Sequence, residues 1–482
     1  MATAAVTPVH LSTAEGHKRT GIRGGERLKP GPRVPSPPRP ISTMPSVLLS
    51  LGRWLRRRLP YIAGAFIVSV GAAVAVYFAF VRAPGDVQND DVEFVEEAPT
   101  KKKRASETFI WPFYGYTPDR ARYLDTKIGP PFRGLWRFNA GDLLEYPPVL
   151  AKGTLFTLNR KGETFALDSR TGKLKWKRRI GNENAASPAW AANRLFVPSF
   201  TDGLTALNAR NGKVQWNTDI PDGAESGPFI MDGIVYTGSG SGTVYALRAR
   251  DGKKVWTYQA DGPVKGALAY SDGNVYFGDY SGEVTALRAK DGAPVWNSST
   301  SGASFSRAGD FYSTPAVAFG RVYLGNTDGK VYSFSAKTGE LAWTKTTGSV
   351  VYGAPAVARV PGTKPTVYIG SNDGKLYALD ARTGGERWQF DTGGQILGST
   401  SVVGRLAYVS NFDGKTFGVD VASGKRAFML DGGRYASAIS DGRRLYVSGF
   451  SSVRALVPEE AAGGKGNKGA KRKARSRRGG SE

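Results

Sequence analysis

Residues 354–390 read APAVARVPGTKPTVYIGSNDGKLYALDARTGGERWQF, and this stretch decides the fold. It contains four short apolar or alternating runs, which are Ala354–Val357, Val367–Gly370, Leu376–Leu379 and Arg387–Phe390. Turn-forming Gly, Asn and Asp residues separate the later runs, and Asn372-Asp373-Gly374 has the composition of a tight hairpin. The stretch therefore predicts one four-stranded antiparallel sheet.

The same unit recurs along the chain. Seven times an aromatic residue follows a small residue by ten positions, in the pairs Ala166/Trp176, Ala206/Trp216, Ala246/Trp256, Ala286/Trp296, Ser333/Trp343, Ala378/Trp388 and Gly418/Phe428. The first four tryptophans are spaced by 40 residues, and the later gaps are 47, 45 and 40. A period near 40 built from short strands predicts an all-β fold, a β-propeller with one blade per repeat.

The two ends of the repeat region complement each other. Residues 436–456 supply three strands and no outer tryptophan strand, while Gly134–Phe138 resembles an outer strand with no blade before it. Trp136 lies 40 residues before Trp176. The sequence therefore predicts an eight-bladed propeller over residues 134–457, closed by the Trp136 strand beside Ala455, because closure removes exposed sheet edges.

The repeated aromatic residues have two possible roles. A large ring on the outer strand can fill the gap left by a small residue on the third strand, which predicts a blade-docking role for Trp136, Trp176, Trp216, Trp256, Trp296, Trp343, Trp388 and Phe428. Stacking on a carbohydrate or a quinone is the alternative. A residue repeated at the same place in every blade favours the structural role.

Composition excludes several kinds of chemistry. The chain has no cysteine, which excludes disulfides, cysteine zinc sites, a thiol nucleophile and a lipid-modified N-terminal cysteine. Its two histidines, His10 and His17, both precede the repeats. The propeller therefore has no imidazole to act as a base or a metal ligand.

The region before the repeats predicts a membrane anchor. Residues 1–60 form a tail with eleven Lys/Arg against two Glu, a net charge of +9, and are expected to be disordered. Residues 61–82 begin with 21 uncharged residues, enough for one transmembrane helix, and Arg56, Arg57 and Arg58 precede them. The positive-inside rule places the N-terminus in the cytoplasm and the propeller outside. A cleaved signal peptide is the alternative.

Two further segments flank the propeller. Residues 83–133 are expected to form a linker followed by an aromatic-rich juxtamembrane part, where Phe109, Trp111 and Phe113 begin a stretch too aromatic to be a free linker. We expect that stretch to pack on the propeller, across one face or along its rim. Residues 458–482 form a second basic tail, with eight Lys/Arg against three Glu and a net charge of +5. Such tails attract anionic surfaces.

The repeat motif places Asp two residues after Ala, followed by Thr-Gly-Lys and then Trp. Ala166, Asp168, Thr171-Gly172-Lys173 and Trp176 match it fully. In this motif the chain resembles the pyrroloquinoline-quinone-type, or quinoprotein-like, β-propeller repeat family over residues 130–457. The resemblance implies a propeller fold. It leaves the activity open, because the family includes quinone-dependent alcohol dehydrogenases, a scaffold lipoprotein of outer-membrane β-barrel assembly, and sensor domains joined to kinases.

The longest irregular connection indicates where a ligand would bind. The repeat between Trp296 and Trp343 is 47 residues long, seven more than the usual 40, and the extra residues fall in the connection 297–313. This connection includes Phe305, Arg307, Asp310 and Tyr312. Loops on a rigid scaffold commonly carry binding residues, so we expect these four to bind a ligand. Asp310 could act as a base and Arg307 could hold an anion, but neither has a partner at diagnostic spacing. No catalytic, cofactor-binding or metal-binding residue is therefore assigned.

These observations favour a non-catalytic scaffold, anchored in the cell membrane, that binds a protein or an envelope polymer outside the cell. A quinone-dependent dehydrogenase and a polysaccharide-binding sensor are the alternatives. No cofactor is expected, and pyrroloquinoline quinone with calcium belongs to the dehydrogenase alternative alone. The membrane, a protein or cell-wall polymer, and anionic surfaces near the tails are the expected partners, and nucleic acid is not.

Overall fold

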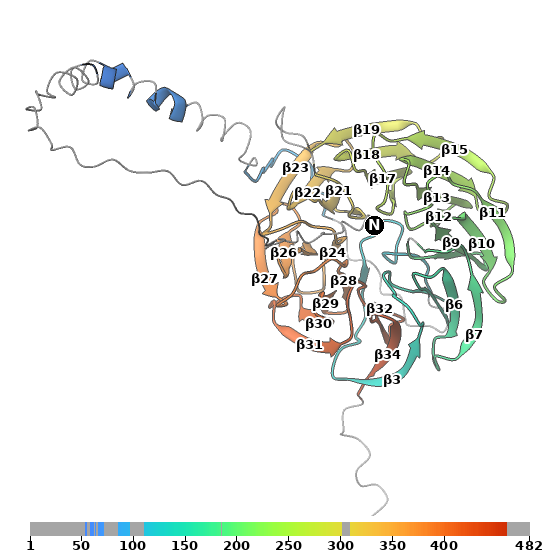
Figure 1. Ribbon diagram of the computed structural model, residues 1–482. Coiled ribbons are helices and arrows are strands. Elements are labelled where there is room, and N and C mark those ends of the chain that lie inside the picture. Colours follow the sequence, from blue (N-terminus) through green and yellow to red (C-terminus); the bar gives the residue numbers. More distant parts are fainter. Residues whose placement is uncertain are drawn as a thin grey trace, which may run out of the picture. The chain divides into compact units, whose positions relative to one another are not determined.

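The computed structural model describes residues 54, 58–61, 63, 66–71, 85–96, 110–184, 186–300 and 309–459. The chain divides into two compact units, Met1–Val74 and Ala75–Glu482. In the first unit the described residues are helical and exposed. In the second unit the strands form eight sheets arranged as blades around a common centre (Figure 1). The predicted all-β, eight-bladed propeller is confirmed.

Blades 1 to 4 are four consecutive meanders. Blade 1 contains β4 (Val149–Ala151), β5 (Thr154–Leu158), β6 (Glu163–Asp168) and β7 (Leu174–Arg179). Blade 2 contains β8 (Ala189–Ala191), β9 (Arg194–Ser199), β10 (Gly203–Asn208) and β11 (Val214–Thr218). Blade 3 contains β12 (Phe229–Met231), β13 (Ile234–Gly238), β14 (Thr243–Arg248) and β15 (Lys254–Gln259). Blade 4 contains β16 (Ala269–Ser271), β17 (Asn274–Gly278), β18 (Glu283–Arg288) and β19 (Pro294–Ser299).

Blades 5 to 7 repeat this order, and blade 8 is shared between the two ends of the propeller. Blade 5 contains β20 (Ala316–Ala318), β21 (Arg321–Gly325), β22 (Lys330–Ser335) and β23 (Leu341–Thr346). Blade 6 contains β24 (Ala356–Ala358), β25 (Thr366–Gly370), β26 (Lys375–Asp380) and β27 (Glu386–Asp391). Blade 7 contains β28 (Ser401–Val403), β29 (Leu406–Ser410), β30 (Lys415–Asp420) and β31 (Arg426–Asp431). Blade 8 contains β32 (Ile439–Ser440), β33 (Leu445–Ser448), β34 (Ser452–Pro458) and β3 (Phe132–Asn139).

Strand β3 closes the ring. It pairs antiparallel with β34, and Trp136 lies opposite Ala455, as the sequence predicted (Figure 1). The pairing extends from Phe132↔Pro458 to Asn139↔Ser452. The first and last strands of the propeller are thus joined by hydrogen bonds, and the outer position of blade 8 is filled.

Each outer-strand tryptophan also joins its blade to the next one. Within blade 3, Trp256 lies opposite Ala246, so the small residue leaves room for the ring. The indole nitrogen then donates to the carbonyl of Ala289 in blade 4, at 2.9 Å. The equivalent indoles donate to Ser169, Ala209, Ala249, Ala336, Ala381 and Val421.

A turn glycine of the next blade lies in contact with each of these indole rings. A Cβ on Gly292 would lie 2.7 Å from the ring of Trp256, and six other turn glycines meet an indole in the same way. The motif glycine also has positive φ, which an L side chain adopts at a cost. The spacing of Gly and Trp in the repeat therefore reflects contact between neighbouring blades.

The aromatic stretch before the propeller lies along the inner edges of the blades. We call residues 110–128 the central segment. Its β1 (Ile110–Trp111) pairs with β4, and its β2 (Tyr123–Leu124) pairs in parallel with β28. Between these strands its carbonyls accept N–H groups from inner strands of blades 2, 4, 5, 6 and 7, donated by Trp190, Tyr270, Val317, Val357 and Val402. The stretch packs on the propeller as expected, but at the centre of the ring instead of the rim.

Residues 85–96 form backbone hydrogen bonds with the outer strand of blade 5. Thr344 N donates to Val87 O at 2.9 Å, and Asn89 N donates to Ala342 O at 2.7 Å, both along β23. Arg321 donates to the carbonyls of Val92 and Glu93. This part of the expected linker is therefore held against the propeller, and it covers the outer edge of blade 5.

The predicted transmembrane helix falls mostly outside the described residues, since only 61, 63 and 66–71 of residues 61–82 are described. Among all described residues, none belongs to a helix with the length and apolarity needed to cross a bilayer. The anchor therefore stays a prediction. Both basic tails also lie outside the described residues, apart from residues 54, 58–60, 458 and 459.

Candidate functional site

The antiparallel meander gives the propeller two different faces. The hairpins between second and third strands, and the connections from each outer strand to the next blade, lie at one end of the blades. We call this end the loop face. The hairpins between first and second strands, and the turns between third and fourth strands, lie at the opposite end, which we call the turn face.

Two tyrosines meet over the centre of the loop face. Tyr146 precedes β4 of blade 1, and Tyr312 precedes β20 of blade 5, so they come from opposite sides of an eight-bladed ring. Their hydroxyl oxygens are 3.4 Å apart. The pair therefore spans the mouth of the ring.

Further rings extend this contact into a cluster. The ring of Tyr312 lies 6.2 Å from that of Tyr280 in blade 4, and 5.9 Å from that of Tyr352, in a perpendicular arrangement. Lys265 lies 5.2 Å from the centroid of Tyr280 and forms a 2.9 Å ion pair with Glu225. We call Tyr146, Tyr280, Tyr312 and Tyr352 the tyrosine cluster. All four residues are half-buried, so part of the surface of each remains accessible.

The central segment contributes two buried arginines to the interior of the ring. Arg120 donates to the carbonyls of Leu268 at 2.8 Å and Gly227 at 3.1 Å, and also to that of Tyr114. Arg122 donates to the carbonyls of Arg120 and Pro355, and its guanidinium lies 4.4 Å from the ring centroid of Tyr114. Burial lowers the pKa of Arg120 to about 9, so the group remains cationic at neutral pH.

The loop face is acidic. Its described connections carry thirteen Asp/Glu and four Lys/Arg, a net charge of −9. Burial raises the pKa of Glu145, next to Tyr146. Burial also raises the pKa of Tyr312 to about 12, so its hydroxyl is neutral and can donate a hydrogen bond at physiological pH. The surface therefore offers neutral aromatic donors within a negative field.

The sequence-predicted ligand residues separate into two groups. Tyr312 belongs to the tyrosine cluster, and Asp310 lies next to it, where its N–H donates to Thr327 Oγ1 at 2.7 Å. Phe305 and Arg307 lie outside the described residues. Whether these four residues bind a ligand stays a prediction.

Sequence reasoning assigned no binding role to Tyr146 and Tyr352, and it placed Tyr280 on the same face as residues 297–313 while favouring an ordinary turn for its hairpin. Tyr146 and Tyr352 lie in connections of ordinary length, and Tyr280 lies in a hairpin that resembles every other hairpin. What these residues share is a tyrosine in a loop on the loop face. The sequence does not show that these loops meet, because they belong to blades that are far apart along the chain.

The described residues give no cluster of acidic side chains to which the calcium ion of the quinone-dependent alternative could be assigned. No three His, Asp or Glu side chains among them lie close enough together to hold a metal ion. We therefore derive no redox step for this chain. That the protein works without a cofactor remains an expectation.

The arrangement at the mouth of the ring is suited to recognition. Tyrosine presents a large rigid surface and a polar tip at low entropic cost, and it is enriched at the energetic centres of protein interfaces. Nothing among the described cluster residues pairs a nucleophile with a base. The tyrosine cluster therefore has the features of a binding surface.

Comparison with known proteins supports the fold. A family model for the outer membrane protein assembly factor BamB matches residues 133–227, 218–351 and 347–465. The crystal structure of BamB from Moraxella catarrhalis aligns with a TM-score of 0.58 at 18% identity, covering 68% of this chain and 99% of that chain. A search of curated proteins gave no match.

Two dehydrogenases align equally well. The quinohemoprotein alcohol dehydrogenase ADHIIG from Pseudomonas putida HK5 has a TM-score of 0.62 at 14% identity, covering 73% of this chain and 80% of that chain. A europium-containing methanol dehydrogenase has a TM-score of 0.62 at 14% identity, covering 73% and 98%. At such identities the likeness shows the fold alone.

Proposed function

The chain belongs to the propeller family represented by the outer membrane protein assembly factor BamB, and on that premise we propose that it is a membrane-anchored scaffold that binds a protein partner outside the cytoplasm. The binding surface is the tyrosine cluster on the loop face. The observation that carries the proposal is the meeting of Tyr146 and Tyr312 over the centre of the ring, with their hydroxyls 3.4 Å apart.

The blades of a propeller surround a central channel. Here the central segment pairs with the inner strands of blades 1 and 7, and it accepts hydrogen bonds from four of the blades between them. A ligand approaching from the loop face therefore meets an aromatic floor, made of the tyrosine cluster and the central segment. Such a floor fits a protein surface, whose contact energy concentrates in a few aromatic anchors.

The negative charge of the loop face indicates which charge the partner's contact surface should have. With a net charge of −9 on the described loop-face connections, electrostatic steering favours a partner whose contact surface is basic. We therefore expect binding to weaken with rising salt. Rim charges act mainly on the association rate, so the salt effect should appear there first.

The membrane anchor is part of the same proposal. Residues 61–81 are uncharged and follow Arg56, Arg57 and Arg58, a pattern that favours a single-pass helix with a cytoplasmic N-terminus. The propeller, which follows the anchor in the sequence, would then lie on the other side of the cell membrane.

Site-specific photo-crosslinking in living cells tests the binding surface. A photo-reactive phenylalanine analogue at Tyr352 samples the tyrosine cluster, and the same analogue at Lys253 samples an exposed turn on the opposite face. We expect a discrete protein adduct from position 352 and none of equal yield from position 253. Equal yields at both positions, or no adduct at position 352, would contradict the proposal.

A polysaccharide ligand is the second candidate, because partly exposed tyrosine rings also stack on sugars. The observation that favours it is the same ring cluster, with Tyr280 and Tyr352 on either side of Tyr312. Binding on a glycan array that is lost in Tyr312→Ala, together with no protein adduct from position 352, would favour the sugar over the protein.

A further inference from the structure

The turn face has the opposite charge to the loop face. Its connections carry sixteen Lys/Arg and six Asp/Glu, a net charge of +10 against −9 on the described loop-face connections. Six successive blades each place an exposed basic residue at the same position of the turn between third and fourth strands, namely Arg170, Arg210, Arg250, Lys290, Lys337 and Arg382. These residues form an arc of positive charge on the turn face that extends over blades 1 to 6 of the eight.

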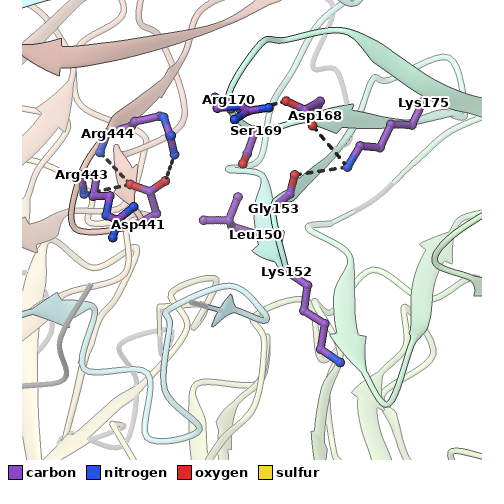
Figure 2. A pocket seen from close by; sticks show the side chains of 10 residues that line it. All are labelled: Leu150, Lys152, Gly153, Asp168, Ser169, Arg170, Lys175, Asp441, Arg443 and Arg444. Atoms are coloured by element: carbon purple, nitrogen blue, oxygen red, sulfur yellow. Dashed lines mark hydrogen bonds and ion pairs between the residues drawn. The ribbon is translucent and has the colours of Figure 1, made fainter. Parts of the chain in front are cut away.

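A pocket lies at one end of this arc, where blade 8 meets blade 1. It has a volume of about 270 Å³ and is lined by Leu150, Lys152, Gly153, Asp168, Ser169, Arg170, Lys175, Asp441, Arg443 and Arg444. Five of these side chains are cationic and two are anionic, which gives a net charge of +3. Figure 2 shows Asp441, Arg443 and Arg444 on one wall and Asp168, Arg170 and Lys175 on the other, while Lys152 points away from both.

Local hydrogen bonds already occupy the two aspartates. Asp168 accepts bonds from the N–H and the hydroxyl of Thr171, at 2.9 and 3.0 Å. Asp441 accepts a 2.6 Å bond from the guanidinium of Arg444 and a 3.0 Å bond from the hydroxyl of Tyr446. Asp168 also forms a 3.7 Å ion pair with Lys175, so Lys175 and Arg444 are each paired with one of the two carboxylates. The net charge of +3 is then carried by Lys152, Arg170 and Arg443.

We propose that this pocket binds a phosphate group of a linear, phosphate-bearing envelope polymer, and that the basic arc binds further phosphates along the same chain. Guanidinium groups match the oxygens of phosphate in a bidentate manner, and lysine adds a point charge. A polymer with regularly spaced anions can place one group in the pocket, which includes Arg170, and others on Arg210, Arg250 and Lys290 in succession.

A membrane surface fits this face less well than a polymer. Peripheral membrane binding combines basic residues with apolar side chains that enter the bilayer. No exposed large hydrophobic residue lies in a described turn-face connection itself, and Phe450, which is 49% exposed, lies in a hairpin of the loop face. The exposed apolar side chains near the turn face are Val95, beside Phe319 of blade 5, and one residue at the start of the outer strand in each of blades 1 to 4, namely Leu174, Val214, Val255 and Val295. They come one to a blade, whereas the basic residues recur in every connection they flank. The statement that the polymer belongs to the cell envelope rests on the proposed extracytoplasmic location of the propeller. The statement that the pocket binds phosphate does not.

The full chain, purified in detergent, allows a direct test with linear polyphosphate as the probe. The double variant Arg170→Ala/Arg443→Ala removes one cation from each wall of the pocket. The double variant Lys161→Ala/Lys415→Ala is the matched control, because it removes the same charge from exposed positions at the loop-face end of the blades. Both variants keep the two basic tails, so any contribution of the tails is equal.

We expect the pocket variant to bind polyphosphate about tenfold more weakly than the unaltered chain, which corresponds to the loss of about 1.4 kcal/mol. The control should change the dissociation constant less than twofold, and inorganic phosphate should compete with the polymer. Circular dichroism and the unfolding midpoint verify that both variants are folded.

Three results would overturn the proposal. Equal weakening by the two variants would mean that only overall charge matters. Stronger binding to polygalacturonate than to polyphosphate would assign a carboxylate polymer instead. Binding to vesicles of phosphatidylglycerol, without binding to polyphosphate, would assign the membrane. None of these results bears on protein crosslinking at Tyr352, so the two proposals can fail separately.

Discussion

At the scale of single residues, the contact between Trp and Gly joins the blades. The indole of Trp256 donates to Ala289 of the next blade, and the ring lies over Gly292, where no side chain fits. Tyr236 in the same blade donates to the same carbonyl at 3.1 Å. One backbone carbonyl thus receives two aromatic side chains, which fixes the angle between neighbouring blades.

Two glycine substitutions separate backbone strain from ring contact. Gly292 and Gly273 both have positive φ, of 74° and 81°, but a Cβ at Gly273 meets nothing within 4 Å. Gly273→Ala should therefore cost about 1–2 kcal/mol in the free energy of unfolding, from strain alone. Gly292→Ala should cost about 2 kcal/mol more, because it also displaces the indole. Urea unfolding measures both, and equal losses would refute the role of the contact.

At the scale of elements, the central segment connects the inner strands of blades 1, 2, 4, 5, 6 and 7 through backbone hydrogen bonds. Its carbonyls accept N–H groups from Tyr270, Val317 and Val357 among others, and Arg120 binds carbonyls of blades 3 and 4. Inner strands of three residues would otherwise present unpaired backbone groups at the centre. The segment therefore stabilises the floor beneath the tyrosine cluster.

Arg120→Met in the full chain tests this function of the segment. The change leaves the carbonyls of Leu268, Gly227 and Tyr114 without the guanidinium, which should cost about 3 kcal/mol. Hydrogen exchange should accelerate at the amides of Tyr270 and Val317. Arg133→Met, at an exposed position of β3, is the control and should change stability by less than about 0.5 kcal/mol. Unchanged exchange in Arg120→Met would show that the segment is held without the arginine.

At the scale of the whole molecule, the two faces of the propeller differ in both charge and chemistry. The loop face combines a negative field with tyrosine rings, while the turn face combines a positive field with a recessed pocket. The two proposed partners therefore approach opposite ends of the blades. A protein and a polymer could bind together without competing for the same surface.

Protease protection tests the orientation proposed for the whole chain. Added trypsin should cleave the tail after residue 458 in cells whose outer layers have been made permeable, because that tail holds eight Lys/Arg. The tail of residues 1–60 holds eleven Lys/Arg, and an epitope placed there should survive until the cell membrane is dissolved. Loss of the N-terminal epitope, with survival of the C-terminal one, would reverse the orientation.

The sequence by itself determined the blade count and the closure of the ring. The small-residue/aromatic pairs repeat because every blade docks on the next one in the same way, so the period reports a local, repeated contact. Trp136 extended that period by one step, and this placed β3 beside Ala455. The blade count can be read from a single sequence because the same pattern of residues recurs in every repeat.

Only the tertiary structure decided that the central segment lies at the centre of the ring and that Tyr146 and Tyr312 meet above it. Tyr146 and Tyr312 are 166 residues apart and share no motif, and they become neighbours because blades 1 and 5 are opposite each other. The pocket between Arg170 and Arg443 likewise joins the first blade to the last. Contacts across a closed ring depend on its curvature and on the number of blades, and no local pattern of residues encodes them.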